Sequence, residues 1–164
     1  MRHSAATLVS LLLLALHNAS GAAERLSWFD LVPPEAQHLI GMPEPMHEMG
    51  DLADLMESEY GDPAVQTEPL APVVAALHGK QVQIPGYVVP LGINDAGKVD
   101  EFLLVPYFGA CIHVPPPPSN QIVHVQSNSA IALADLYQPF WISGEMQVEL
   151  IESELANAGY RMSN

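Results

Sequence analysis

The chain has 164 residues, and its 19 Asp and Glu residues outnumber its 5 Lys and Arg residues, which gives a formal net charge of −14 at pH 7. Such an acidic chain repels the phosphates of nucleic acids and the headgroups of anionic lipids, so we exclude both as partners. The length suits one domain with its own hydrophobic core.

The N-terminus has the three parts of a cleavable secretory signal. Arg2 supplies a positive charge, residues Ala5 to Leu16 carry no charge, and small residues follow up to Ala23. The apolar run is shorter than the about 20 residues that span a bilayer. We therefore expect residues 1–23 to be removed, a periplasmic location for the rest, and no membrane span in the mature chain.

Two regions are expected after the signal. Residues 24–66 form an acidic N-terminal extension rich in Met and Pro, in which residues 48–60 have helical periodicity. Residues 67–164 form the main domain. Its first part, Thr67 to Leu77, predicts a helix, because Thr67 can cap it and its apolar residues recur on one face.

From Lys80 the pattern changes to that of β-strands. Strands are predicted over residues 80–91, 99–105, 109–114, 121–126 and 139–151, with a final edge strand at 160–162. A short helix is expected over 130–137 and a helical turn over 153–158. This order predicts a mainly β fold, namely a small OB-like β-barrel with short helices and an N-terminal helical or irregular extension.

Residues 84 to 121 contain a long and distinctive motif. It combines IPGYVVPL at 84–91 with EFLLVPYFGACIHVPPPP at 101–118 and Asn120-Gln121. The motif closely resembles the bacterial domain-of-unknown-function family DUF3299, and the likeness extends to Trp28–Pro33 and Ala158–Arg161. The resemblance implies a secreted periplasmic protein, often accompanied by ABC-type transporter components and linked to zinc-responsive gene sets. It implies no activity.

Three residues near this motif form a candidate metal site. Cys111 is the only cysteine, so it cannot form a disulfide within the chain. On a strand, Cys111 and His113 would share one face, roughly 7 Å apart at their Cα atoms, and His124 would approach from the neighbouring strand. A thiolate and two imidazoles are suitable ligands for Zn2+, or alternatively Cu+, with a fourth position for a carboxylate or water.

The same residues also allow a purely structural interpretation. Free cysteine is among the most buried residue types, so Cys111 could simply belong to the core. His113 would then bond a backbone carbonyl, and His124 would face water.

The four prolines Pro115, Pro116, Pro117 and Pro118 must adopt an extended polyproline II conformation. They suit a rigid connector between two strands. Alternatively, they form a ridge that docks a partner together with the neighbouring Tyr107 and Phe108.

The sequence lacks the G-x-S-x-G, H-E-x-x-H and phosphate-loop motifs of common enzymes, so we predict no enzymatic activity. The leading hypothesis is a periplasmic metal-binding accessory protein that handles zinc alongside an ABC-type transport system. The alternative is a structural adaptor without metal, which docks a transporter or another envelope partner through the proline-rich loop.

Overall fold

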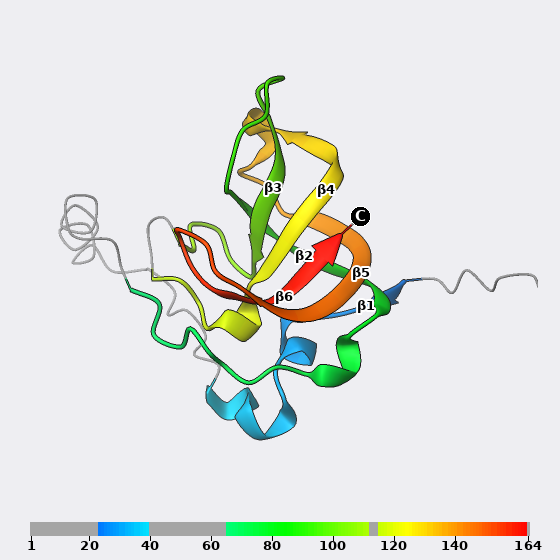
Figure 1. Ribbon diagram of the computed structural model, residues 1–164, viewed down its shortest axis with the longest axis vertical. Helices are drawn as coiled ribbons and strands as arrows, with labels where there is room; N and C mark the ends of the chain where they lie inside the picture. Colours follow the sequence, from blue (N-terminus) through cyan, green and yellow to red (C-terminus); the bar gives the residue numbers. More distant parts are fainter. Residues whose placement is uncertain (1–22, 40–64, 112–114, 164) are drawn as a thin grey trace, which may run out of the picture.

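The computed structural model describes residues 23–39, 65–111 and 115–163 (Figure 1). The predicted mainly β class is confirmed, because the described residues form one six-stranded sheet and only short 3-10 helices. The strands are β1 (Glu24–Arg25), β2 (Lys80–Pro90), β3 (Lys98–Val105), β4 (Val123–Ala132), β5 (Phe140–Ile151) and β6 (Ala158–Ser163). The 3-10 helices are η1 (Trp28–Leu31), η2 (Pro34–Leu39), η3 (Ala75–Leu77), η4 (Ser119–Gln121) and η5 (Leu133–Asp135).

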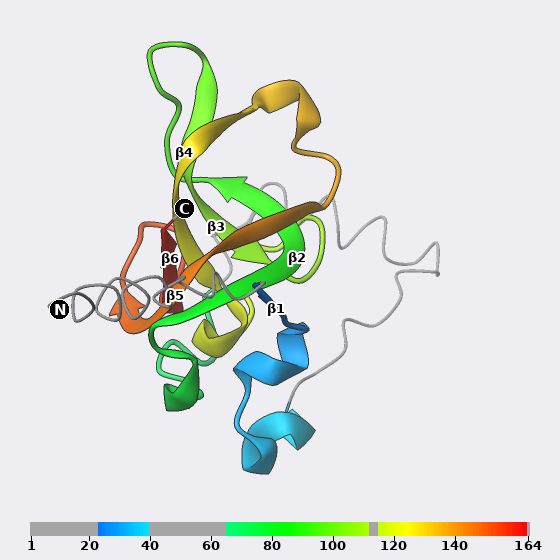
Figure 2. The ribbon, with the colours of Figure 1, turned by 90° about the vertical axis from the view of Figure 1, so that its right-hand side faces the viewer.

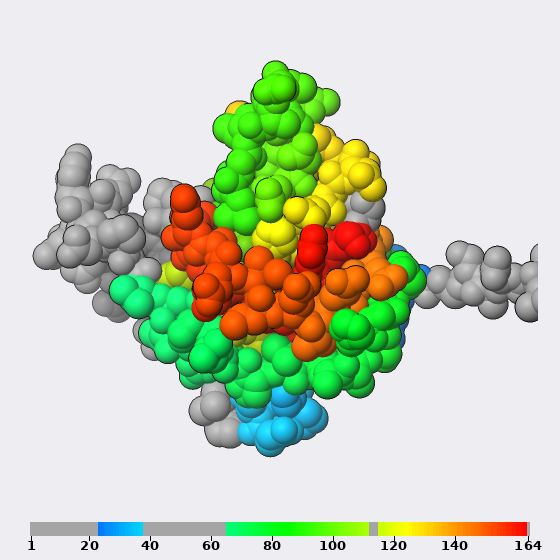
Figure 3. Space-filling model, viewed as in Figure 1, coloured from blue at the N-terminus to red at the C-terminus, as the bar shows by residue number. Residues whose placement is uncertain are grey.

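The strand pairing forms a circuit. The order in the sheet is β1-β2-β3-β4-β6-β5, and β5 also pairs with β2. The β1–β2 and β4–β6 pairs are parallel, and the other pairs are antiparallel. Each of the strands β2 to β6 therefore has at least two hydrogen-bonded neighbours, and β2 has three, which leaves few unpaired backbone groups at sheet edges. Figure 3 shows β4, β5 and β6 packed side by side on one face of the molecule.

The sheet has apolar side chains on both of its faces. The main core contains residues such as Ile84, Phe102, Leu104 and Val125 from one face. The opposite face carries a second cluster made of Val89, Leu103, Val105, Ala110, Ile122, Ala156 and Ala158. Because consecutive side chains of a strand point to opposite faces, β3 contributes to both groups, and all four of its last residues are buried.

The described N-terminal residues pack against the same core. Leu26 and Leu31 belong to it. The indole Nε1 of Trp28 donates a hydrogen bond of 2.7 Å to the carbonyl oxygen of Pro85. Figure 2 shows η1 and η2 at one end of the strands, with β1 beside β2.

Tyr160 of β6 connects three distant parts of the chain. Its ring is fully buried, and its hydroxyl donates to the carbonyl oxygen of Leu31 at 2.6 Å. The same hydroxyl accepts a hydrogen bond of 2.7 Å from the amide of Val74. Burial raises the pKa of Tyr160 to about 12, so the hydroxyl keeps its proton at neutral pH.

The predicted helix over residues 67–77 is wrong, because only η3 at its end is helical. Prolines at positions 69 and 72 remove backbone donors. The remaining groups bond elsewhere: Ala71 donates to the Ser119 hydroxyl at 2.9 Å, and Val74 donates to Tyr160. Partners from distant strands therefore replace the hydrogen bonds of a helix.

Other predicted elements also differ. The helix predicted over 130–137 is reduced to η5, because β4 continues to Ala132. Residues 153–158 contain no helix among the described residues, and Ser153 instead caps a turn by accepting from the amide of Ala156. The strand β6 is longer than predicted and is no edge strand, since it lies between β4 and β5.

The signal segment up to residue 22 and the helix predicted over 48–60 lie outside the described residues.

Within the described ranges, no helix combines the length and the hydrophobicity that a bilayer span requires.

We predict that Tyr160→Phe lowers the free energy of unfolding by about 1–3 kcal/mol, because it leaves the Leu31 carbonyl and the Val74 amide without their partner. Urea denaturation followed by circular dichroism measures the change. Tyr137→Phe is the matched control, since 70% of Tyr137 is exposed and its loss of a hydroxyl should have little effect. Equal stabilities of the two variants would contradict this role of Tyr160.

Candidate functional site

His124 is a buried polar residue on the outer face of the sheet. Its neighbours in β4, Val123 and Val125, point into the main core, so the imidazole points to the opposite side. His124 lies opposite Leu103 of β3 and opposite Arg161 of β6. Only 5% of the residue is exposed.

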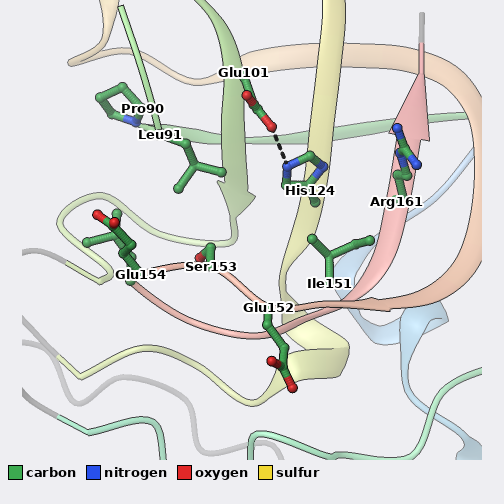
Figure 4. Close-up of a pocket in the computed structure, with 10 residues that line it drawn as sticks. Pro90, Leu91, Glu101, His124, Ile151, Glu152, Ser153, Glu154 and Arg161 are labelled. Atoms are coloured by element: carbon green, nitrogen blue, oxygen red, sulfur yellow. Dashed lines mark hydrogen bonds and ion pairs between the residues drawn. The ribbon is translucent and has the colours of Figure 1, made fainter.

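The two ring nitrogens of His124 have different surroundings. Nε2 lies 3.1 Å from the Oε1 atom of Glu101 on β3, as the dashed line in Figure 4 shows. A carboxylate only accepts hydrogen bonds, so this contact places a proton on Nε2. Nδ1 is buried and has no hydrogen-bond partner among the described residues. In the neutral imidazole, Nδ1 therefore carries a lone pair that can accept a hydrogen bond or bind a metal ion.

A pocket of about 570 Å³ lies beside this histidine (Figure 4). Its size is within the range of small-molecule binding sites. The lining combines three carboxylates, one guanidinium, the imidazole, a hydroxyl and apolar side chains. The residues are Pro90, Leu91, Glu101, His124, Ile151, Glu152, Ser153, Glu154, Leu155 and Arg161.

Arg161 extends the polar part of the lining. Its Nη2 atom donates to Oε1 of Gln126 at 2.6 Å, and its Nη1 atom lies 3.7 Å from Oε2 of Glu149. Its Nε atom is buried without a hydrogen-bond partner in the part of the chain that the structure describes. The lining therefore includes a histidine and an arginine that each have one buried nitrogen without a hydrogen-bond partner among the described residues.

Cys111 lies elsewhere on the same side of the sheet. It packs against the second cluster and is absent from the lining of the pocket. Its φ angle of 66° is left-handed, so it does not lie in a regular strand. The predicted strand over 109–114 is therefore wrong at Cys111, and the argument that Cys111 and His113 share a strand face no longer applies.

The structure brings His124 together with Glu101 and Arg161, while Cys111 borders the second cluster. His113 lies outside the described residues. Across residues 23–39, 65–111 and 115–163, no group of three or more His, Cys, Asp or Glu side chains is arranged to hold a metal ion. Glu101 and Arg161 were missed in the sequence, because only the pairing register of β3, β4 and β6 places them beside His124.

The proline segment is largely integrated into the domain. Pro116 and Pro117 are buried, whereas Pro115 is exposed. The side-chain amide of Gln66 donates to the carbonyl oxygen of Pro117 at 2.8 Å. These contacts suit a rigid connector, and they leave little of the proline ridge accessible to a partner.

The two aromatic residues before the prolines differ in exposure. Tyr107 is half-buried, and its pKa is raised by burial and by the nearby Cys111. Phe108 is 61% exposed, and its ring meets that of Tyr87 edge to face, with 5.8 Å between the ring centroids. Phe108 is thus the more accessible of the two.

These features define a mainly β protein built on one sheet, with a polar pocket on the outer face of the sheet. The family model described as "Protein of unknown function (DUF3299)" matches residues 28–164, so the chain belongs to the DUF3299 family, as the central motif predicted. The chain is similar to a DUF3299 family protein from Pseudomonas aeruginosa PAO1 with a crystal structure. The two are 50% identical, the TM-score is 0.70, and the match covers 87% of this chain and 93% of that chain. The search of curated proteins gives no significant match.

We predict that the Cys111 thiol reacts slowly with iodoacetamide at neutral pH. Burial raises its pKa from 9.0 to about 11, and only the thiolate is a good nucleophile. The alkylation rate, measured by mass spectrometry, should therefore rise with a midpoint near pH 11 in the folded protein. The urea-unfolded protein is the control and should show a midpoint near pH 9. A common midpoint for both would contradict the burial of the thiol.

Proposed function

We propose that this protein is a non-enzymatic, zinc-binding accessory protein of the periplasm, and that His124 is its central metal ligand. The observation that carries the proposal is the arrangement of the imidazole. Metal-binding histidines usually donate the hydrogen of their second ring nitrogen to a carboxylate, which fixes the ring and increases its basicity. The Nε2–Glu101 contact has this form, and the buried Nδ1 is left to bind an ion.

Cys111 and His113 are the further ligands that this proposal retains from the sequence. The high pKa of the Cys111 thiol has a consequence for such a site, because zinc must displace the proton to bind sulfur. Zinc affinity is therefore expected to fall as the pH falls. Cu+, which also prefers thiolate and imidazole ligands, is the alternative ion.

The place of the pocket in the fold supports a binding function. The circuit β2-β3-β4-β6-β5-β2 has the strand order of an OB-like barrel, which we include in the proposal. OB folds bind ligands on the face of their second and third strands and at the loop between their fourth and fifth strands. If β2 is taken as the first strand and the strands are numbered in chain order, the second and third strands are β3 and β4. The loop between the fourth and fifth strands is then the β5–β6 connection. All three contribute to the pocket, through Glu101, His124 and residues 152–155.

The proposed compartment and partner derive from the N-terminal signal pattern and from the family resemblance. Transfer of zinc to or from an ABC-type transport system would give a periplasmic binding protein its role. The negative charge of the chain favours this role, because it raises the local concentration of cations.

One observation favours the structural adaptor as a second candidate. Phe108 exposes a large aromatic surface beside the proline segment, where a partner protein could bind. The adaptor needs no metal, so Cys111→Ser should leave its function intact if the fold persists. The zinc-binding protein should lose function in the same variant.

We predict that zinc stabilises the parent protein, by about 2.7 kcal/mol when free zinc is about a hundred times its dissociation constant. His124→Ala should abolish the zinc-dependent shift in melting temperature. Glu101→Gln should weaken zinc binding by about 10–100-fold, because it replaces the carboxylate that orients the imidazole. Melting curves with zinc and with a chelator measure both effects.

His78→Ala is the matched control for these variants, since His78 is an exposed histidine that accepts a hydrogen bond from the amide of Val148. Its zinc-dependent shift should equal that of the parent. The proposal fails if the parent shows no shift, or if His124→Ala shifts as much as the parent does.

A further inference from the structure

The pocket on the outer face of the sheet has an excess of negative charge. Its lining contains three carboxylates, those of Glu101, Glu152 and Glu154, and one guanidinium, that of Arg161. The guanidinium lies 3.7 Å from Glu149, a carboxylate outside the lining, which offsets its positive charge. With the imidazole neutral, three carboxylates and one guanidinium give the lining a formal charge of −2. The pocket therefore attracts cations.

Glu101 is an accessible carboxylate that a buried side chain holds in place. Its Oε1 atom accepts the Nε2 hydrogen of His124 at 3.1 Å, while 47% of the Glu101 side chain is exposed. Its Oε2 atom has no hydrogen bond with the described residues, so it can accept one from a bound molecule. A free glutamate loses rotamer freedom when it binds a ligand, and here the imidazole has already restricted that freedom.

Two further carboxylates come from the β5–β6 connection. Glu152 and Glu154 are exposed, and neither forms an ion pair or a hydrogen bond with the described residues. Ser153 between them bonds the amide and the carbonyl oxygen of Ala156, at 3.1 and 2.6 Å, which fixes the turn that carries both acids. The connection therefore presents negative charge that has no positive partner in the part of the chain that the structure describes.

Apolar side chains complete the lining. Leu91, Ile151 and Leu155 contribute to it, and the volume of about 570 Å³ has room for a small organic molecule. Figure 4 shows Glu101 and Glu154 on separate sides of the pocket, with Leu91 between them. A molecule with an aliphatic body covers this apolar surface, whereas a small inorganic cation leaves it in contact with water.

From these observations we infer that the pocket binds an aliphatic diamine, a short hydrocarbon chain with an ammonium group at each end. One ammonium group donates to Glu101, the other lies against the carboxylates of residues 152 and 154, and the methylene groups between them pack on the apolar lining. The two positive charges match the charge of the lining. The inference goes beyond the proposed zinc binding and does not rest on it, because no metal ion takes part.

The probe is 1,5-diaminopentane, titrated by calorimetry into the full mature chain after dialysis against a chelator has removed metal ions. We expect one diamine to bind to each chain. The comparison compound 1-aminopentane has the same hydrocarbon chain and a single ammonium group. It should bind about fivefold more weakly, because it lacks one partly exposed ion pair. Magnesium ions have the charge of the diamine without its hydrocarbon, and at equal concentration they should not displace it.

Glu101→Gln removes the carboxylate at one end of the pocket, and the double variant Glu152→Gln/Glu154→Gln removes those at the other. Each should bind the diamine about as weakly as the parent binds 1-aminopentane. The matched controls are Glu35→Gln and Glu35→Gln/Glu68→Gln, which remove the same charges at exposed positions outside the lining. The controls should keep the affinity of the parent, and circular dichroism should show all variants folded.

Three outcomes would overturn the inference. The first is the absence of diamine binding to the parent, and the second is equal affinity for the diamine and for 1-aminopentane. The third is equal weakening in the pocket variants and in their controls, since the diamine would then respond only to the overall negative charge. None of these outcomes decides the proposed function, which depends on the zinc-dependent shift in melting temperature.

Discussion

The parallel pairing of β4 with β6 is the constraint on which both the core and the pocket depend. It sets Val123 beside Tyr160 on the inner face of the sheet and His124 beside Arg161 on the outer face. A shift of one residue would exchange these faces, because side chains alternate along a strand. The same register therefore buries the tyrosine that anchors the N-terminal segment and assembles the polar residues of the pocket.

The pocket is polar at a place where the sheet is otherwise apolar. Leu103 and Ile122 of the second cluster lie on the same face as His124. An imidazole nitrogen and a guanidinium nitrogen are buried there with no partner in the part of the chain that the structure describes, which reduces stability, since each has lost its contact with water. Sites that bind ligands often retain such unfavourable groups, because a ligand restores the missing interactions.

The parts of the fold that depend on local pattern could be predicted from the sequence. Alternating residues followed by a turn predicted strands over 80–91 and 99–105, and the structure has β2 and β3 there. The helix over 67–77 could not be judged correctly from periodicity, because distant partners such as Ser119 and Tyr160 bond its backbone.

The candidate site was predictable only in part, for a similar reason. His124 was recognised from its residue type and its position on a strand next to the central motif. The partners of His124 come from two other strands, so their identity depends on a register that no local pattern encodes. The left-handed conformation of Cys111 was equally hidden, since such a φ angle is uncommon outside glycine, asparagine and aspartate.

The position of β6 has a consequence for when the protein can fold. This strand ends at Ser163, yet it lies between β4 and β5, and its Tyr160 contacts Leu31, which is 129 residues earlier in the chain. Contacts between such distant residues form slowly, because a long loop must close first. The core therefore cannot be completed until the residues of β6 have been synthesised. Until then β4 and β5 lack the strand that lies between them, so the edges that will pair with β6 stay without backbone partners during synthesis.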